Sequence, residues 1–548
     1  MPTQSLVRCA LAAALTLSVA ACASTSSGPA AASPAVALPL VEVPDIRHPD
    51  GESASWWFRD GAAQAAARGA MEGRARNVIL FVGDGMSLAT VAAARIHQGQ
   101  LRGAPGEENR LSWEHFPATA LSKTYNTDQQ TPDSAGTMSA MATGAKTRAG
   151  MISVAQSMHF GDCTGLEEGR LLTLWELAAE AGMATGVVTT TRLTHATPAS
   201  TLAHSPSRNW ENDTQVPEQA RAAGCTDIAR QMIENPYGTG PRVMLGGGRA
   251  HFMTNAQADP EYPERRGQRA DGLDLVALWQ QRHPQGAYVW NAGQLASAPP
   301  DAPLLGLFEP GHMQYEHDRA NDGAGEPSLA EMTRAAITRL EGSPDGFVLL
   351  VEGGRIDHAH HAGNAYRALT DTVALSDAVQ VAHDMTSRDD TLILVTADHA
   401  HTMGFVGYPG RGNPILGKVA KADRHGRVEQ ATDRDGLPYT TLVYANGPGY
   451  AGDHGRPDLS QVDTTGPDYL QEATVPLGSE THGGDDVGIW ATGPGSHAVR
   501  GSVEQNAIFH FMLQSTPHLR EAFCARGGCT ADGVPVELPA PGDFDATP

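Results

Sequence analysis

Acidic and histidine side chains follow three apolar runs of strand length in this chain of 548 residues. The runs are residues 77–82, followed by Asp84; residues 347–351, followed by Glu352, Asp357, His358, His360 and His361; and residues 391–396, followed by Asp398, His399 and His401. One acid after a strand often only caps the next helix. Three strand ends that carry Asp, Glu and His together are better explained as ligands of zinc and magnesium.

The same runs alternate with segments of helical periodicity, such as residues 371–385. This alternation predicts an α/β fold, with a doubly wound, mostly parallel central sheet and helices on both faces. The length fits one large domain with insertions, or two domains. Ligands of such sheets bind outside the carboxyl ends of the strands. We therefore expect the acids and histidines to meet at one edge of the sheet.

Ser134 lies in the stretch TPDSAGTMSAMATG, between an acid and a run of small residues. Thr, Asp and Ser before a helical run are ordinary N-cap residues, so a helix cap is the simplest interpretation. A nucleophilic serine would also need an activating group. His482, in the Gly-rich loop ETHGGDD, would by itself be a surface histidine. Together with the three strand ends, it completes a second zinc site.

The formal net charge of −23 argues against nucleic acid as a partner. The same charge would repel an anionic substrate from most of the surface. A site for such a substrate must therefore be locally positive, through metal ions or a buried arginine.

The N-terminus has the layout of an export signal. Arg8 precedes an apolar stretch that ends at Cys22 and is too short for a stable membrane span. The residues before Cys22 resemble the lipobox of bacterial lipoproteins, in which the cysteine is acylated; an ordinary signal peptide cut near the same place is the alternative. We therefore expect a signal peptide over 1–21, followed by a lipidated Cys22 and a flexible tether over 22–50. The protein would be exported to the periplasmic or cell-surface side and attached to the membrane only by its lipid.

The C-terminal residues 531–548 are Pro-rich and acidic, and we expect them to be disordered.

Besides Cys9 and Cys22, four cysteines remain, and an oxidising compartment would allow them to pair. Cys524 and Cys529 flank a short flexible loop, which favours a bond between them. Cys163 would then pair with Cys225.

Five motifs, in this order, resemble those of the alkaline phosphatases: VGDGM, TPDSAGTMSAMATG, VEGGRIDHAHH, TADHAH and ETHGGDD. The resemblance runs from about residue 50 to about residue 530, and segments such as GLFEPGHMQYE look especially like the vertebrate enzymes. It implies a catalytic domain over 51–530 and a crown-like insertion over about 402–475. It also implies a homodimer and hydrolysis of phosphomonoesters through a phosphoserine, with two zinc ions and one magnesium ion.

The resemblance also assigns roles to individual residues. Ser134 would be the nucleophile and Arg208 would bind the phosphate; His195 and His358 would lie just behind the metal ligands, whereas His360 and His401 match no ligand role. The metal ligands would be Asp357, His361 and His482 for the first zinc; Asp84, Asp398 and His399 for the second; and Asp84, Thr197 and Glu352 for magnesium. A calcium site is a further candidate, formed by Glu261, the Phe308 carbonyl, Glu309 and Glu326, although the last position is usually Asp and the loop before it is longer here.

Two kinds of alternative remain. One is a phosphodiesterase or sulfatase of the same superfamily; the residues around Ser134 do not form the CxPxR context of sulfatases, and a diesterase would have another group in place of Arg208. The other is a phosphate-binding lipoprotein without turnover, which would need no nucleophile.

Overall fold

The computed structural model describes residues 41, 43, 51–452, 455–540 and 542. The expected signal peptide, Cys22 and nearly all of the expected tether lie outside these residues. No helix in the described part of the chain is both long and apolar enough to cross a bilayer.

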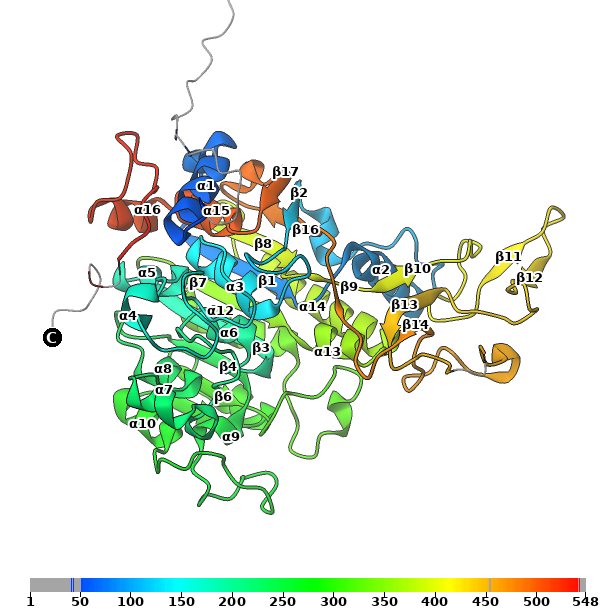
Figure 1. The fold of residues 1–548 in the computed structure, drawn as a ribbon, viewed down its shortest axis with the longest axis horizontal. Coiled ribbons are helices and arrows are strands. Elements are labelled where there is room, and N and C mark those ends of the chain that lie inside the picture. Colours follow the sequence, from blue (N-terminus) through cyan, green and yellow to red (C-terminus); the bar gives the residue numbers. More distant parts are fainter. Residues whose placement is uncertain (1–40, 42, 44–50, 453–454, 541, 543–548) are drawn as a thin grey trace, which may run out of the picture. The chain divides into compact units, whose positions relative to one another are not determined.

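A ten-stranded sheet forms the centre of the fold (Figure 1). Its strand order is β17-β2-β16-β8-β1-β7-β3-β4-β6-β5, and only β16 runs antiparallel to its neighbours. The predicted α/β fold with a mostly parallel sheet is therefore confirmed. The strands are β1 (Asn77–Gly83), β2 (Ala118–Lys123), β3 (Ala184–Arg192), β4 (Val243–Gly247), β5 (Ala287–Val289), β6 (Leu304–Leu307), β7 (Phe347–Gly353), β8 (Thr391–Ala397), β16 (Val487–Thr492) and β17 (Gly501–Glu504).

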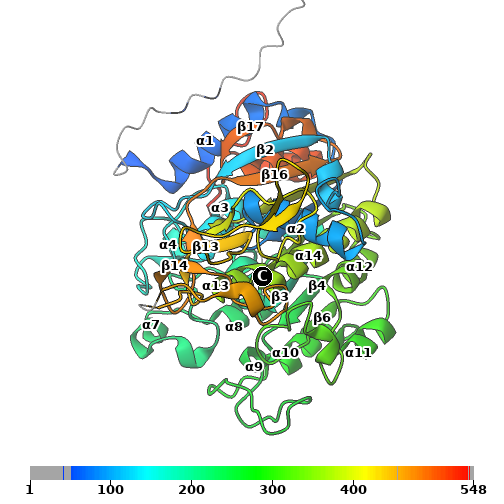
Figure 2. The ribbon, with the colours of Figure 1, turned by 90° about the vertical axis from the view of Figure 1, so that its right-hand side faces the viewer.

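Helices cover both faces of this sheet (Figure 2). Alternate side chains of the central strand β1 enter two different cores: Val78 and Leu80 pack on one side, and Ile79 and Phe81 on the other. The first core includes residues of α1 (Ala54–Ala67), α3 (Ser134–Thr143), α5 (Leu174–Glu180), α6 (Ala196–Ala199), α8 (Ile228–Glu234), α9 (Arg249–Phe252), α10 (Leu275–Arg282), α15 (Ala507–Ser515) and α16 (Pro517–Cys524). The second includes residues of α2 (Leu88–Leu101), α11 (Ala292–Ser297), α12 (Leu329–Leu340), α13 (Arg355–His361) and α14 (Ala365–Met385). A strand that is buried on both faces has a continuous apolar sequence, as β1 does.

Small sheets occupy the segment predicted as an insertion, and β11 and β12 project from the body in Figure 1. β15 pairs with β9, with His482 opposite His401, so this short ladder brings the late ETHGGDD loop to the end of β8. The strands are β9 (Ala400–His401), β10 (Met403–Phe405), β11 (Ala420–Ala422), β12 (Val428–Gln430), β13 (Leu442–Gly447), β14 (Ala473–Pro476) and β15 (His482–Gly483).

The structure contains both predicted disulfides, Cys163–Cys225 and Cys524–Cys529, with Cα–Cα distances of 6.0 Å and 5.4 Å. The first lies in a small apolar cluster with Trp210 and Val216, beside α4 (Leu166–Gly169) and α7 (Glu218–Ala222).

The expectation of a disordered tail from residue 531 is wrong for its first part. Val534 and Val536 are buried against Ala62 and Ala66 of α1. The backbone N–H groups of Val536 and Glu537 also donate to the carbonyl of Gly528. Two valines spaced two residues apart place both side chains on one face of an extended segment, which gives that face an apolar surface to bury despite the prolines around it.

Candidate active site

The carboxyl ends of β1, β7 and β8 lie side by side and bring the predicted acids together. Gly83 at the end of β1 is in register with Gly353 of β7 and with Ala397 of β8. Asp84, Glu352 and Asp398 therefore meet at one edge of the sheet, and all three are fully buried. Burial of several carboxylates without cations is unfavourable, so this edge of the sheet favours the binding of cations.

Asp84, Asp398 and His399 form one group of possible metal ligands, with ligand atoms within 4.8 Å of one another. The Nε2 atom of His399 lies 3.3 Å from Asp84 Oδ1 and 3.3 Å from Asp398 Oδ2, while its Nδ1 faces the Ala400 carbonyl at 3.2 Å. Both carboxylate oxygens of Asp84 are buried, and neither has a hydrogen-bond partner in the described part of the chain. Burial, together with Asp398, Asp357 and Glu352, raises the pKa of Asp84 well above its ordinary value. A divalent cation between these groups would remove that penalty.

Asp357, His361 and His482 form a second group. The Nδ1–H groups of His361 and His482 donate to the carbonyls of Glu480 and Pro132, at 2.6 Å and 2.7 Å. Each Nε2 atom therefore carries a lone pair. The two Nε2 atoms face each other at 3.1 Å and lie 3.3 Å and 3.4 Å from Asp357 Oδ1. Two lone pairs and a carboxylate that converge without a proton between them are typical of a zinc site with carbonyl-oriented histidines.

Glu352, Thr197 and Asp84 supply an oxygen-rich position. Thr189 and Thr191 donate hydroxyl hydrogen bonds to Oε2 of Glu352. Burial nevertheless raises the pKa of Glu352 to about 7. Oε1 of Glu352 and Oγ1 of Thr197 are buried without a hydrogen-bond partner. Carboxylate and hydroxyl oxygens suit magnesium better than zinc.

Ser134 is the first residue of α3, and Asp133, not Ser134, is its N-cap. Asp133 Oδ2 accepts hydrogen bonds from the backbone N–H groups of Ala135 and Gly150, at 3.0 Å and 2.8 Å. This cap leaves the Ser134 hydroxyl free to face the metal ligands, with Oγ 3.0 Å from Nε2 of His399. The sequence-based interpretation of Ser134 as the cap is therefore corrected by one position.

Arg208 reaches the same place from the segment after α6. Its Nη1 donates to Asp133 Oδ1 at 2.6 Å, and its Nη2 donates to Nε2 of His195 at 3.1 Å. The ring centroids of His195 and His358 are 5.3 Å apart. The structure thus brings together the residues that the sequence predicted for catalysis, zinc and magnesium, with both histidines next to them.

Three further residues contribute to this site. The sequence predicted no catalytic or metal role for Asp133 and Glu480, and for His401 a structural position behind the metal ligands. Asp133 caps α3 and orients Arg208. His401 places its ring nitrogens 2.7 Å from Asp357 Oδ1 and 2.5 Å from Glu480 Oε2, so it connects a metal-ligand candidate with a buried acid. The TADHAH motif contained the signal for His401, because residues 399 and 401 share one face of an extended segment. Glu480 is the first residue of the ETHGGDD motif, but its contact with His401 depends on the pairing of β9 with β15.

A separate cluster contains the predicted calcium ligands Glu261, Glu309 and Glu326, with Phe308 directly before Glu309, and adds Asp322. Burial first, and then the other acids of the cluster, raise the pKa of Glu261 to about 7 and that of Glu326 to about 8. Oε1 of Glu261 and Oδ1 of Asp322 are buried without a partner. The carboxylates thus gather around one place, as oxygen ligands of calcium do.

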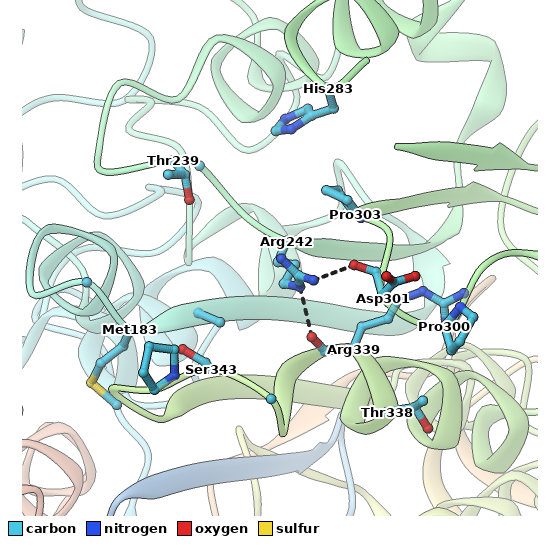
Figure 3. A pocket seen from close by; sticks show the side chains of 15 residues that line it. Met183, Thr239, Arg242, His283, Pro300, Asp301, Pro303, Thr338, Arg339 and Ser343 are labelled. Carbon is cyan, nitrogen blue, oxygen red and sulfur yellow. Dashed lines mark hydrogen bonds between the residues drawn. The ribbon is translucent and has the colours of Figure 1, made fainter. Parts of the chain in front are cut away.

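A cavity of about 640 Å³ lies at the opposite, amino-terminal edge of the sheet (Figure 3). Arg242, Arg339 and His283 line it, and Arg242 donates to the carbonyls of Arg339 and Asp301. None of the predicted site residues lines this cavity, so the active site belongs to the carboxyl edge.

The family model for alkaline phosphatase matches residues 75–517 of this chain. The tissue-nonspecific alkaline phosphatase isozyme of Rattus norvegicus is 44% identical over 451 residues, which is 81% of this chain and 84% of the rat protein. The corresponding isozyme of Homo sapiens is 43% identical over 479 residues, 85% of this chain and 89% of the human protein.

Solved structures agree with the sequence comparison. The alkaline phosphatase of Thermus thermophilus superposes with a TM-score of 0.57 at 27% identity, covering 82% of this chain and 92% of that one. The alkaline phosphatase of the Antarctic bacterium TAB5 shares the fold, with a TM-score of 0.53 at 22% identity over 81% of this chain and 98% of that one.

Proposed function

This chain belongs to the alkaline phosphatase family, and we propose that it hydrolyses phosphomonoesters through a phosphoserine formed at Ser134. The observation that carries the proposal is the position of Ser134 Oγ. It lies at the start of α3 and 3.0 Å from His399, beside buried acids whose oxygens the described protein groups leave unsatisfied.

The residues fit the metals that the family implies. Asp357, His361 and His482 would hold one zinc ion; Asp84, Asp398 and His399 the other; and Asp84, Thr197 and Glu352 a magnesium ion. Bound there, two zinc ions supply Lewis acidity to the attacking and leaving oxygens of a phosphoryl transfer. The unpartnered oxygens of Asp84, Glu352 and Thr197 support this assignment, because protein groups alone leave them unsatisfied.

The chain's own residues would perform the rest. Ser134 Oγ gives its proton to solvent and forms a bond to phosphorus while the ester P–O bond breaks, and the departing alkoxide takes a proton from water to leave as the alcohol. A water molecule then forms a bond to phosphorus as the Ser134 Oγ–P bond breaks, which releases inorganic phosphate, and Ser134 Oγ recovers its proton from solvent. Arg208 would hold two non-bridging oxygens with its planar fork, in the orientation that Asp133 fixes. The N-terminus of α3, a helix of ten residues, adds N–H groups and a positive dipole end.

The proposal predicts a clear ranking of substrates. A monoester presents three non-bridging oxygens to Arg208 and the metals, whereas a diester blocks one of them and a sulfate ester carries less negative charge. We expect kcat/KM for p-nitrophenyl phosphate at alkaline pH to exceed that for bis-p-nitrophenyl phosphate and p-nitrophenyl sulfate by about 10²-fold or more, a difference of about 3 kcal/mol in the barrier. Equal rates on the diester or the sulfate, or phosphate binding without turnover, would refute it.

A calcium ion would occupy the cluster of Glu261, the Phe308 carbonyl, Glu309 and Glu326, with Asp322 as an additional acid. Because the pKa values of Glu261 and Glu326 are raised, the folded state holds their protons more tightly than the unfolded state. Without calcium, Glu326 makes folding less favourable as pH rises from about 4.5 through about 8, by at most about 1.4 kcal/mol per pKa unit. Glu261 acts in the same direction up to about pH 7, with a smaller effect because Arg249 pairs with it.

We therefore expect the Tm of the calcium-free protein to fall between pH 6 and 8.5, with zinc and magnesium held constant, and calcium to reverse most of that fall. Glu326→Gln should make the decline shallower and reduce the calcium effect. Glu167→Gln, at an exposed glutamate, is the matched control and should behave like the wild type. A decline and a calcium response unchanged in Glu326→Gln would exclude this site.

Lipidation of Cys22, export and homodimer formation remain parts of the proposal. Exposed apolar side chains of the crown-like segment, including Phe405, Tyr408 and Val475, support a dimer contact there. Mass spectrometry of the mature N-terminus tests the lipid, and sedimentation tests the dimer.

A further inference from the structure

Three imidazoles gather beside the predicted phosphate clamp. His195 precedes α6, His312 lies in the loop after β6, and His358 belongs to α13. Ring centroids are 5.3 Å apart for His195 and His312, 5.3 Å for His195 and His358, and 4.2 Å for His312 and His358. One ring nitrogen of each lies within 4.8 Å of the others. His312 had no predicted role.

Each of these rings accepts a hydrogen bond from a different arginine. Nη2 of Arg208 donates to Nε2 of His195 at 3.1 Å, and Nη1 of Arg355 donates to Nδ1 of His358 at 2.9 Å. A neutral imidazole that accepts at one nitrogen carries its proton on the other. His195 and His358 thus each have an N–H donor left. Among the described residues, the buried Nδ1 atom of His195 has no hydrogen-bond partner, although a ring nitrogen of His195 also lies within 4.8 Å of carboxylate oxygens of Asp84 and Glu352.

Among the residues that the structure describes, Arg192 is the hydrogen-bond partner of His312. The backbone N–H of Arg192 donates to Nδ1 of His312 at 3.2 Å, and the guanidinium of Arg192 contacts Nε2. Because Nδ1 of His312 accepts this bond, its Nε2 carries the proton. The Nε2–H group of His312 and the guanidinium N–H group of Arg192 are then two donors that face each other. An anionic oxygen next to them would satisfy both.

The charges around the cluster favour an anion over a metal ion. Each of the three rings accepts a hydrogen bond from an arginine N–H, which requires a ring nitrogen without a proton. Arg192 and Arg208 have carboxylate partners in Glu211 and Asp133.

Arg355 lacks a close ion pair, although the buried carboxyl of Asp371 interacts with it electrostatically at longer range. It makes no ion pair with any carboxylate in the described ranges; it stacks on Tyr315 at 3.8 Å, and its Nε is buried without a partner. Three neutral imidazoles alone would suit zinc, but a guanidinium without a close ion pair, together with unpaired N–H donors, disfavours a cation and attracts an anion.

We propose that His195, His312 and His358, with Arg355, bind a second anionic group of a substrate whose first phosphate lies on Arg208. The 3.1 Å contact between Arg208 and His195 places the two subsites side by side. The substrates that fit are therefore small phosphate compounds with a carboxylate or another phosphate a few bonds from the first phosphorus. This inference rests on the proposed phosphomonoesterase function and specifies its substrate class.

The test compares substrates that differ in this second group. Glycerol 3-phosphate and 3-phosphoglycerate differ by a hydroxymethyl group in place of a carboxylate, and pyrophosphate provides a second phosphate. We expect His312→Asp, which places a negative charge in the subsite, and Arg355→Met, which removes the unpaired cation, each to lower kcat/KM for 3-phosphoglycerate or pyrophosphate at least about 10-fold relative to glycerol 3-phosphate. His317→Asn, five residues from His312 and outside the cluster, is the control and should leave both ratios unchanged.

The inference would be overturned if, in both variants, the ratio of kcat/KM for 3-phosphoglycerate or pyrophosphate to kcat/KM for glycerol 3-phosphate stayed within twofold of the wild-type ratio. In that case, turnover of glycerol 3-phosphate would show that the proposed function still stands. An additional zinc or nickel ion per wild-type chain, lost in His312→Asp, would overturn it in favour of a metal site. If wild type loaded with zinc and magnesium hydrolyses none of the three substrates, the proposed function itself fails.

Discussion

Replacing Ser134 with alanine should reduce turnover of p-nitrophenyl phosphate by about 10³-fold or more, while the zinc and magnesium content stays that of the wild type. The variant lacks the oxygen that accepts the phosphoryl group, and removal of a covalent nucleophile has effects of this size or larger. The ligand atoms proposed for the metals belong to other residues. The measurement pairs steady-state kinetics with metal analysis of the same purified samples.

Ser139→Ala is the matched control, because Ser139 lies on the same helix but has a structural hydroxyl. That hydroxyl donates to the Met151 carbonyl at 3.1 Å and accepts from the Ser153 backbone N–H at 2.7 Å. We expect its loss to lower the free energy of unfolding by about 1–3 kcal/mol and to change turnover only a few-fold. If Ser134→Ala retained turnover within tenfold of wild type, Ser134 would not be the nucleophile.

Asp84→Asn should have opposite effects on the metal-loaded and metal-free proteins. With metals, Asp84 would be shared by a zinc and the magnesium, so we expect loss of bound metal and a fall in turnover of about 10³-fold or more. Without metals, its carboxylate is buried and unpartnered, and its pKa is raised. The charged form therefore destabilises the folded state above its ordinary pKa, and a neutral amide of the same size should make the metal-free protein more stable at pH 8, by about 1–3 kcal/mol.

Denaturant unfolding of chelator-treated wild type and Asp84→Asn, at pH 5 and pH 8, measures this effect. The variant should exceed wild type in free energy of unfolding by more at pH 8 than at pH 5. At pH 8 the wild-type Asp84 carboxyl must either ionise in a buried position or keep a proton that the unfolded chain would release, and both lower the stability of the folded state. A metal-free variant that is less stable than wild type at both pH values would mean that Asp84 is paired within the protein itself. Full metal content and turnover in the variant would exclude it as a ligand.

The sequence predicted the strand ends well because their signal is local. Buried parallel strands are continuous apolar runs, and the residues that follow such strands necessarily lie at one edge of the sheet. The common location of Asp84, Glu352 and Asp398 therefore follows from the sequence alone. Helix limits were less certain: α14 begins at Ala365, six residues before the predicted segment, because Asn364 accepts a hydrogen bond from the Arg367 backbone N–H.

Residues that depend on long-range pairing could not be predicted. Glu480 reaches His401 only through the ladder between β9 and β15, and His312 meets His195 and His358 only through the loop that follows β6. Asp322 joins the acidic cluster from a loop of unusual length. In each case the chemistry of the residue was visible in the sequence, but its neighbours are set by tertiary structure.

The central claim is covalent transfer of phosphate to Ser134. Wild type loaded with zinc and magnesium should be incubated with isotopically labelled inorganic phosphate at mildly acidic pH and quenched in strong acid, and its peptides should be mapped by mass spectrometry. We predict label on the peptide that contains residues 131–144, located at Ser134, and none in Ser134→Ala. Label on another residue, or rapid hydrolysis of p-nitrophenyl phosphate without any trapped phosphopeptide, would contradict this mechanism.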